Sequence, residues 1–129
     1  MKSPKKIYAI DNALVSRLGF HFSGEERRLL ENLVYVELRR RGGEIFYHNI
    51  DNAECDFVVC EGFRVTKAIQ VCYLLDAYDT RERELRGVQA AIDVYELSAG
   101  TIITNSHEKE MKYGDKTIYI LPAWKWLID

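Results

Sequence analysis

The stretch Glu54-Cys55-Asp56-Phe57-Val58-Val59 places a carboxylate within a short apolar run, the pattern of a buried β-strand. Two other stretches share this feature: Ile69-Gln70-Val71-Cys72-Tyr73 carries an amide, and Leu29-Leu30-Glu31-Asn32 carries a second carboxylate. A polar group in apolar surroundings costs free energy unless it has a partner. These three stretches therefore hold the first candidates for a functional site.

Hydrophobic periodicity and turn residues place the three stretches on a helix and two strands. A helix is predicted over residues 23–41, because Ser23 can cap it, acidic residues fill its first turn, and Gly42-Gly43 follows three arginines. A second helix is predicted from Arg81 to about residue 97. Strands are predicted over residues 6–10, 44–49, 54–60, 68–74, 99–104 and 116–121. This order predicts an α/β fold with a mixed sheet flanked by helices, in which strands 68–74 and 99–104 are parallel.

The composition is that of one globular domain. The chain has 129 residues, 47% of them hydrophobic, and its net charge of −2 creates no overall positive field that would attract nucleic acid. No apolar run is long enough to cross a bilayer, and no G-x-x-x-x-G-K-[ST] phosphate-binding loop is present. The three cysteines form no C-x-x-C pair, which favours reduced thiols and a cytoplasmic protein. The histidines show no zinc-ligand spacing.

A series of short motifs runs in order through nearly the whole chain. The motifs are Lys5-Lys6-Ile7-Tyr8-Ala9-Ile10-Asp11-Asn12, Leu29-Leu30-Glu31-Asn32, Val34-Tyr35-x-Glu37-Leu38, Arg40-Arg41-Gly42, Glu54-x-Asp56-Phe57-Val58, Ile69-Gln70-Val71-x-Tyr73 and Thr80-Arg81-Glu82-Arg83-Glu84-Leu85. In these motifs the chain resembles the uncharacterised C-terminal domain of bacterial and archaeal AAA-type ATP-binding proteins. Its element order resembles the core of the PD-(D/E)XK nuclease superfamily. The resemblance implies a restriction-endonuclease-like core, a single domain over residues 1–129, and an ATPase module in the same polypeptide.

The resemblance also implies a role for each polar residue. Glu31 takes the place of the helix glutamate and Asp56 that of the metal-binding aspartate, so these two residues would bind Mg²⁺ or Mn²⁺. Gln70 stands where the second acid belongs, and Cys72 stands where the lysine belongs. An amide brings no charge to a metal ion, and a thiol does little to stabilise transition-state charge. We therefore expect Glu31, Asp56 and Gln70 to meet in a relic site that binds divalent ions weakly.

Basic residues form a second candidate surface. Arg39, Arg40 and Arg41 end the first helix beside the expected site, and with Lys67 and Arg81 they are candidates for DNA contacts. The alternative is that these residues are solvated helix ends. Lys67 is expected to point to the other face of the sheet from Gln70, because it lies an odd number of residues earlier on the strand.

Structural roles are open for the acidic and amide residues as well, and Asp56 could be an acid near a turn that accepts hydrogen bonds from backbone amides. Glu31 could pair with an arginine, for example Arg64, Arg81 or Arg83, and Gln70 could be a hydrogen-bonded amide in a buried strand. The charged run over residues 76–86 is expected to be a solvated helix face.

Three functions follow from this reasoning. The first is an accessory or regulatory nuclease-fold domain of an AAA-type ATPase, catalytically degenerate and a candidate for DNA binding. The second is an active divalent-metal-dependent DNA nuclease. The third is a protein-interaction module that does not bind nucleic acid. A positive rim around Asp56 would favour the first two functions, and an acidic or apolar rim the third.

Overall fold

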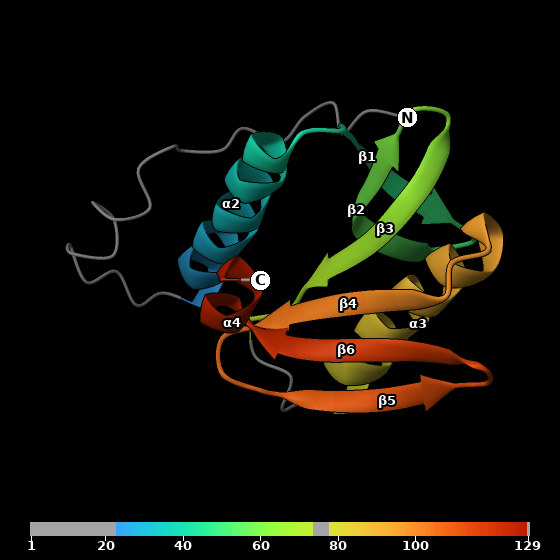
Figure 1. Ribbon diagram of the computed structural model, residues 1–129. Helices are drawn as coiled ribbons and strands as arrows, with labels where there is room; N and C mark the ends of the chain where they lie inside the picture. Colours follow the sequence, from blue (N-terminus) through green and yellow to red (C-terminus); the bar gives the residue numbers. More distant parts are fainter. Residues whose placement is uncertain (1–22, 74–77, 129) are drawn as a thin grey trace.

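The computed structural model describes residues 23–73 and 78–128. The elements, labelled as in Figure 1, are α2 (Ser23–Arg41), β1 (Glu44–Ile50), β2 (Ala53–Glu61), β3 (Arg64–Val71), α3 (Tyr78–Tyr95), β4 (Ala99–Thr104), β5 (Lys109–Tyr113), β6 (Lys116–Pro122) and α4 (Ala123–Leu127). The strand predicted over residues 6–10 lies outside the described residues. Helix α2 has the predicted bounds. Its first turn holds Glu25 and Glu26, and it ends where Gly42 adopts a positive φ of 90° and donates its N–H to the Arg39 carbonyl.

The sheet is mixed, as predicted, and has the strand order β1-β2-β3-β4-β6-β5. Antiparallel pairing joins β1 to β2, β2 to β3, and β5 to β6. Strand β3 pairs with β4 in parallel, so the predicted crossover through α3 is confirmed, and β4 pairs with β6 in parallel. The α/β class with helices flanking a mixed sheet is therefore confirmed.

Each face of the sheet has its own hydrophobic cluster. Helix α3 packs on one face, where Val88 and Ile92 contact buried residues of the strands such as Ile102. Helix α2 and the short α4 pack on the other face, where Val34 and Leu38 belong to one cluster with residues of β2 to β4. Figure 1 shows α3 behind the sheet, with α2 and α4 in front and to one side. Helix α2 therefore leaves part of the front face of β3, β4 and β6 uncovered. None of the helices in the described ranges is long and apolar enough to cross a membrane.

The structure differs from the predicted elements at β3, β5 and α3, and the short helix α4 (Ala123–Leu127) was not predicted. Strand β3 begins at Arg64, four residues before the predicted start, because the half-exposed segment 64–67 pairs with β2. Strand β5 was not predicted. Its side chains are exposed or half-buried, and its pairing with β6 defines it as a strand. Helix α3 begins at Tyr78 and ends at Tyr95, two residues before the predicted end.

Candidate functional site

One arginine lies at the centre of a group of acidic side chains. The guanidinium of Arg27, in the first half of α2, lies 3.4 Å from a Glu31 carboxylate oxygen, 3.7 Å from one of Glu84 and 3.9 Å from one of Asp56. The three carboxylates come from α2, α3 and β2. We call Arg27, Glu31, Asp56 and Glu84 the carboxylate cluster. The fold therefore brings Glu31 and Asp56 to one cation, although they are far apart in the sequence.

Gln70 joins the same site through the backbone. The Asp56 N–H donates to Oε1 of Gln70 at 2.7 Å, and Nε2 of Gln70 donates to the Glu54 carbonyl at 2.9 Å. In return, the Val71 N–H donates to Oδ2 of Asp56 at 2.9 Å. The expected meeting of Glu31, Asp56 and Gln70 is thus confirmed. Both polar atoms of the Gln70 amide bond to the β2 backbone, which is the structural role that the sequence left open for this residue.

Glu84 is the acidic residue that the sequence did not single out. It lies in the charged run that was expected to be a solvated helix face, but its exposed fraction is 2%, so that expectation is wrong for this residue. Arg27 and Arg83 approach its Oε1 at 3.7 and 3.9 Å, whereas its Oε2 has no hydrogen-bond partner among the residues that the structure describes. The only signal in the sequence is its place one residue before the apolar Leu85, on the core side of α3.

Burial and charge shift the proton affinities in the cluster. Burial, together with the charge of Asp56, raises the pKa of Glu84 from 4.5 to about 7, although Arg27, Arg83 and the Gln70 amide partly oppose the shift. Burial alone would lower the pKa of Arg27, but the charges of Asp56, Glu84 and Glu31 raise it above its ordinary value. Arg27 is therefore fully charged at any physiological pH, and the charge on Glu84 changes near neutrality.

Cys72, which stands at the expected lysine position, is a buried thiol. Burial and the charge of Glu84 raise its pKa to about 11. The thiol is therefore neutral at physiological pH and contributes no charge to the cluster.

The donor set of the cluster suits a hard cation, but the arrangement does not. Carboxylate oxygens are the ligands that Mg²⁺ and Mn²⁺ prefer. Here the guanidinium of Arg27 already supplies the positive charge among the three carboxylates, and in the described ranges no three His, Cys, Asp or Glu residues are grouped so that they could hold a metal ion. The cluster as it stands does not fit a bound divalent ion, so we assign it no metal-dependent step.

The basic candidates do not form one patch beside Asp56. Glu37 pairs with both Arg40 and Arg41, each at 2.7 Å, and the hydrogen bond from Arg40 does most to lower the Glu37 pKa to about 2. Arg41 also stacks on the Trp126 ring at 4.5 Å. Arg39 is exposed at the end of α2.

The two remaining basic candidates lie on separate surfaces. Lys67 faces Glu61 at 3.8 Å on the α2 side of the sheet, the face opposite Gln70, as expected. Arg81 is exposed in the first turn of α3, on the other side of the sheet. The cation that lies beside Asp56 is none of these five candidates. It is Arg27, which the sequence did not indicate.

The pKa of Glu84 predicts how stability depends on pH. A carboxyl whose pKa is higher in the folded than in the unfolded chain stabilises the fold fully below pH 4.5, and this contribution is lost as the pH rises through about 7. The replacement Glu84→Gln keeps the shape but removes the titration. From pH 4 to pH 8 we expect the unfolding free energy of wild type to fall by about 3 kcal/mol relative to that of Glu84→Gln.

This prediction is checked by urea denaturation at a series of pH values. Glu82→Gln, an exposed neighbour on α3, is the control and should follow the wild-type pH dependence. Parallel pH curves for wild type and Glu84→Gln would show that Glu84 does not titrate in this range.

Comparison with known proteins finds an uncharacterised protein of Methanocaldococcus jannaschii. The two sequences are 38% identical over 135 aligned positions, which cover 96% of this chain and 29% of the archaeal protein. The chain thus spans less than a third of the length of that relative. No family model and no solved structure matches the chain.

Proposed function

We propose that this chain is a nuclease-like domain that has lost catalysis and acts as an accessory, regulatory module of an AAA-type ATP-binding protein in the cytoplasm. One observation supports the loss of catalysis above all others, namely the contact of one guanidinium with Glu31, Asp56 and Glu84. The restriction-endonuclease-like assignment rests on the motif resemblance. Glu31 and Asp56, the two acids to which the resemblance gives a metal-binding role, both contact Arg27, and their closeness agrees with this assignment.

The chemistry of the cluster supports a structural role. Phosphodiester hydrolysis of the kind implied by the resemblance needs a divalent ion that lowers the pKa of the attacking water. A guanidinium supplies charge and hydrogen bonds but does not generate hydroxide, because it does not coordinate water as a metal ion does. With the amide of Gln70 bonded to the backbone and the thiol of Cys72 neutral, Arg27 instead links α2 to β2 and α3.

The accessory role is supported by what this sequence lacks and by the length of its relative. The sequence contains no phosphate-binding loop, so in our proposal a separate module binds ATP. The archaeal relative is long enough to hold further modules beside the region that matches this chain. Of the partners expected from the sequence, the contacts favour a protein module over DNA, since Arg27, Arg40 and Arg41 are each already paired with carboxylates.

A second candidate function is an active nuclease, and Glu84 is the observation that favours it. Its buried carboxylate restores the negative charge that Gln70 lacks, and Arg27 is 39% exposed and so has room to turn away. In that case Glu31, Asp56 and Glu84 together would hold the ion. The cleavage assay distinguishes the two functions.

We expect no cleavage of single-stranded, duplex or branched DNA by this chain in Mg²⁺ or Mn²⁺ above the background of an Asp56→Asn control. Loss of one preorganised charged group typically slows catalysis by about 10²–10³-fold, and both the second acid and the lysine are replaced here. Time courses with end-labelled oligonucleotides measure this.

Cleavage by wild type that both Asp56→Asn and Glu84→Gln abolish would contradict the proposal and favour the nuclease. Cleavage that appears only when Arg27 is replaced by alanine would show that the site persists and that the arginine blocks it.

A further inference from the structure

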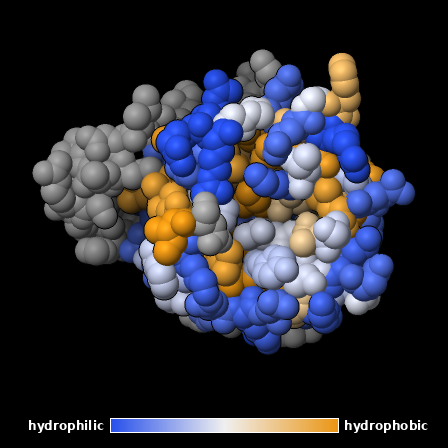
Figure 2. Space-filling view, in the orientation of Figure 1, coloured by the Kyte–Doolittle hydropathy of each residue, from blue (hydrophilic) through white to orange (hydrophobic). Residues whose placement is uncertain are grey.

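A groove opens on the face of the sheet beside α2, away from the carboxylate cluster. Its volume is about 1140 Å³, and its lining comes from β3, β4, β6, the end of α2, the end of α3 and α4. Figure 2 shows this face hollowed, with a weakly polar floor and a largely hydrophilic rim. The volume slightly exceeds the range of typical small-molecule pockets, and the groove is open to solvent along its length.

The groove exists because β3 and β4 diverge. They pair only at Ile69 with Thr101, Gln70 with Ile102 and Val71 with Ile103. Strand β3 continues back to Arg64 beside β2, but the pairing of β2 with β3 contains an irregularity between Val59 and Cys60, and such bulges bend a strand. The two strands therefore form a fork, visible in Figure 1, in which the end of α3 lies.

The fork leaves one edge of β3 open. Over residues 64–68 this strand pairs with β2 on one side, and no described strand pairs with it on the other. An unpaired strand edge presents a row of backbone donors and acceptors to which an added strand can bond. An extended peptide that pairs with such an edge gains backbone hydrogen bonds, and neighbouring pockets select its side chains.

The groove wall beside this edge is mixed in character. Val65, Leu97 and Leu121 contribute apolar surface, whereas Ser98 and Thr101 contribute hydroxyls. A strand places alternate side chains on opposite sides, so a peptide on the β3 edge would direct alternate residues toward this wall. The lining therefore suits a peptide that alternates apolar and polar residues.

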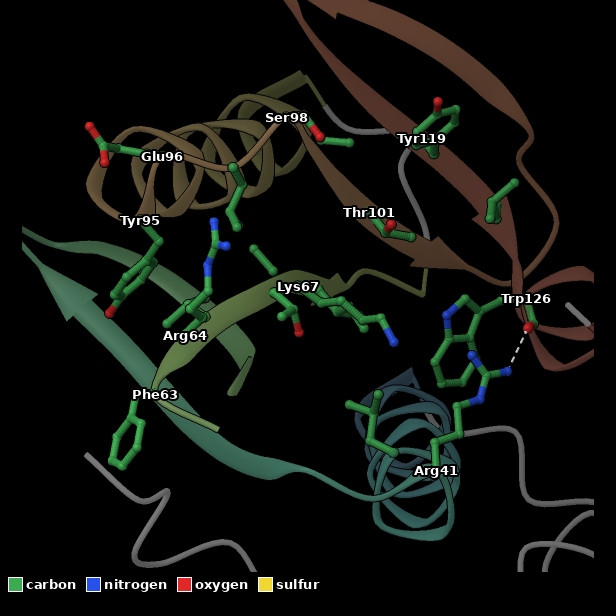
Figure 3. Close-up of a pocket in the computed structure, with 18 residues that line it drawn as sticks. Arg41, Phe63, Arg64, Lys67, Tyr95, Glu96, Ser98, Thr101, Tyr119 and Trp126 are labelled. Carbon is green, nitrogen blue, oxygen red and sulfur yellow. Dashed lines mark hydrogen bonds between the residues drawn. The ribbon is translucent and has the colours of Figure 1, made fainter. Parts of the chain in front are cut away.

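Charge indicates which polar residues the peptide carries. The groove lining holds three cations, Arg41, Arg64 and Lys67, and one acid, Glu96. Figure 3 shows Arg64 and Lys67 extending from β3 into the groove, and Arg41 against Trp126. Arg41 is held by Glu37 and by the Trp126 carbonyl, which accepts a hydrogen bond at 3.0 Å. No ion pair within the described ranges includes Arg64, so this cation can pair with an incoming carboxylate.

The same charges disfavour a nucleic acid in this groove. Binding to a phosphate backbone depends on several cations that each neutralise a phosphate. Two of the three cations here already face a glutamate, Arg41 facing Glu37 and Lys67 facing Glu61, and the whole chain is acidic.

We propose that the groove binds an extended, acidic segment of a partner protein, which adds as a strand to the open edge of β3 over residues 64–68. Arg64, which makes no ion pair within the described ranges, pairs with one of its carboxylates, and the apolar wall accepts its alternate side chains. This inference does not depend on the carboxylate cluster, so the cleavage assay and the test below can fail independently.

A displayed library of random twelve-residue peptides tests the proposal. Selection on wild type, with counter-selection on Thr101→Trp, which fills the groove, should enrich peptides that alternate apolar residues with aspartate or glutamate. The best peptide is then measured by fluorescence anisotropy against two charge-matched double variants. We expect Arg64→Glu with Lys67→Glu to weaken binding by about tenfold or more. Arg86→Glu with Lys109→Glu, which lie outside the groove, should change binding by less than about twofold.

Two further measurements test the strand geometry. Alternate N–H groups of an added strand bond to β3, so a proline placed at each of two adjacent middle positions in turn should abolish binding at one of the two positions. Amide hydrogen exchange should show new protection within residues 64–68 when the peptide is bound. Thermal melts of all variants check that they are folded.

Each of the following results would overturn the proposal. One is a failure to enrich any peptide that distinguishes wild type from Thr101→Trp. Another is equal loss of affinity in the two double variants, or binding that survives proline at both adjacent positions. Tighter, Arg64-dependent binding of a twelve-nucleotide single-stranded DNA would assign the groove to nucleic acid. Sedimentation showing a dimer that the Thr101→Trp replacement dissociates would assign the groove to a second copy of this chain.

Discussion

Replacement of Arg27 by methionine is expected to lower the free energy of unfolding by about 2–3 kcal/mol at neutral pH, less than the 3–5 kcal/mol of a fully buried ion pair because the side chain is 39% exposed. The methionine keeps most of the aliphatic volume but removes the charge that Glu31, Asp56 and Glu84 share. The loss should shrink toward pH 4, where Glu84, whose pKa is raised to about 7, is protonated and no longer repels the neighbouring carboxylates. Urea denaturation at pH 7.5 and pH 4 measures both effects.

The neighbouring Arg28 provides the matched control. Its side chain is 76% exposed and pairs only with Glu25 among the described residues, so Arg28→Met should change the unfolding free energy by about 0.5 kcal/mol or less. The Arg27→Lys variant keeps the charge but lacks the planar guanidinium with its several donors. Its unfolding free energy should lie between those of wild type and Arg27→Met.

A divalent ion should distinguish Arg27→Met from wild type. With the guanidinium removed, three carboxylates face one another, and a bound Mn²⁺ would stabilise the folded state in proportion to its affinity. We expect Mn²⁺ to raise the melting temperature of Arg27→Met more than that of wild type. Equal stabilisation of both proteins, or an Arg27→Met variant as stable as wild type, would contradict the role given to Arg27.

Replacement of Gly87 by alanine is expected to destabilise the protein by about 3 kcal/mol or more, the upper end for overpacked cores. A Cβ at this position would lie 1.9 Å from the Glu54 carbonyl oxygen and 2.9 Å from its carbon, so either α3 or β2 must move. In an exposed helix the same change would stabilise by about 1 kcal/mol, so the sign of the effect reports the close packing of α3 on β2. Chemical denaturation gives the value.

Gly100→Ala provides a graded comparison. There a Cβ would meet Val88 Cγ1 at 2.5 Å, a side-chain methyl that can shift, so we expect a smaller loss than at Gly87. Movement of α3 in Gly87→Ala should also displace Glu84, so the pH dependence that we expect from Glu84 should weaken in this variant. A Gly87→Ala protein as stable as wild type would show that α3 does not approach β2 this closely.

Local signals in the sequence were sufficient for the regular elements. The acidic first turn and the Gly-Gly stop define α2, because each acts within one or two helical turns. The short apolar runs likewise predicted β1, β2 and β4, with ends displaced by at most one residue. The weaker elements, β5 and the first half of β3, escaped prediction because strand pairing defines them more than their own residues do.

The sequence by itself thus determined the α/β class. The expectation that Glu31, Asp56 and Gln70 would meet came from the motif resemblance, together with the cost of leaving a polar group unpartnered in an apolar segment. Only the tertiary structure decided what these residues do there. The packing of α3 on β2 at Gly87 brings Glu84 into the interior, and α2 carries Arg27 to the three carboxylates. The fork between β3 and β4 follows from an irregularity in strand register. These contacts join residues distant in the chain. No local sequence pattern encodes how α2 and α3 pack on the two faces of the sheet.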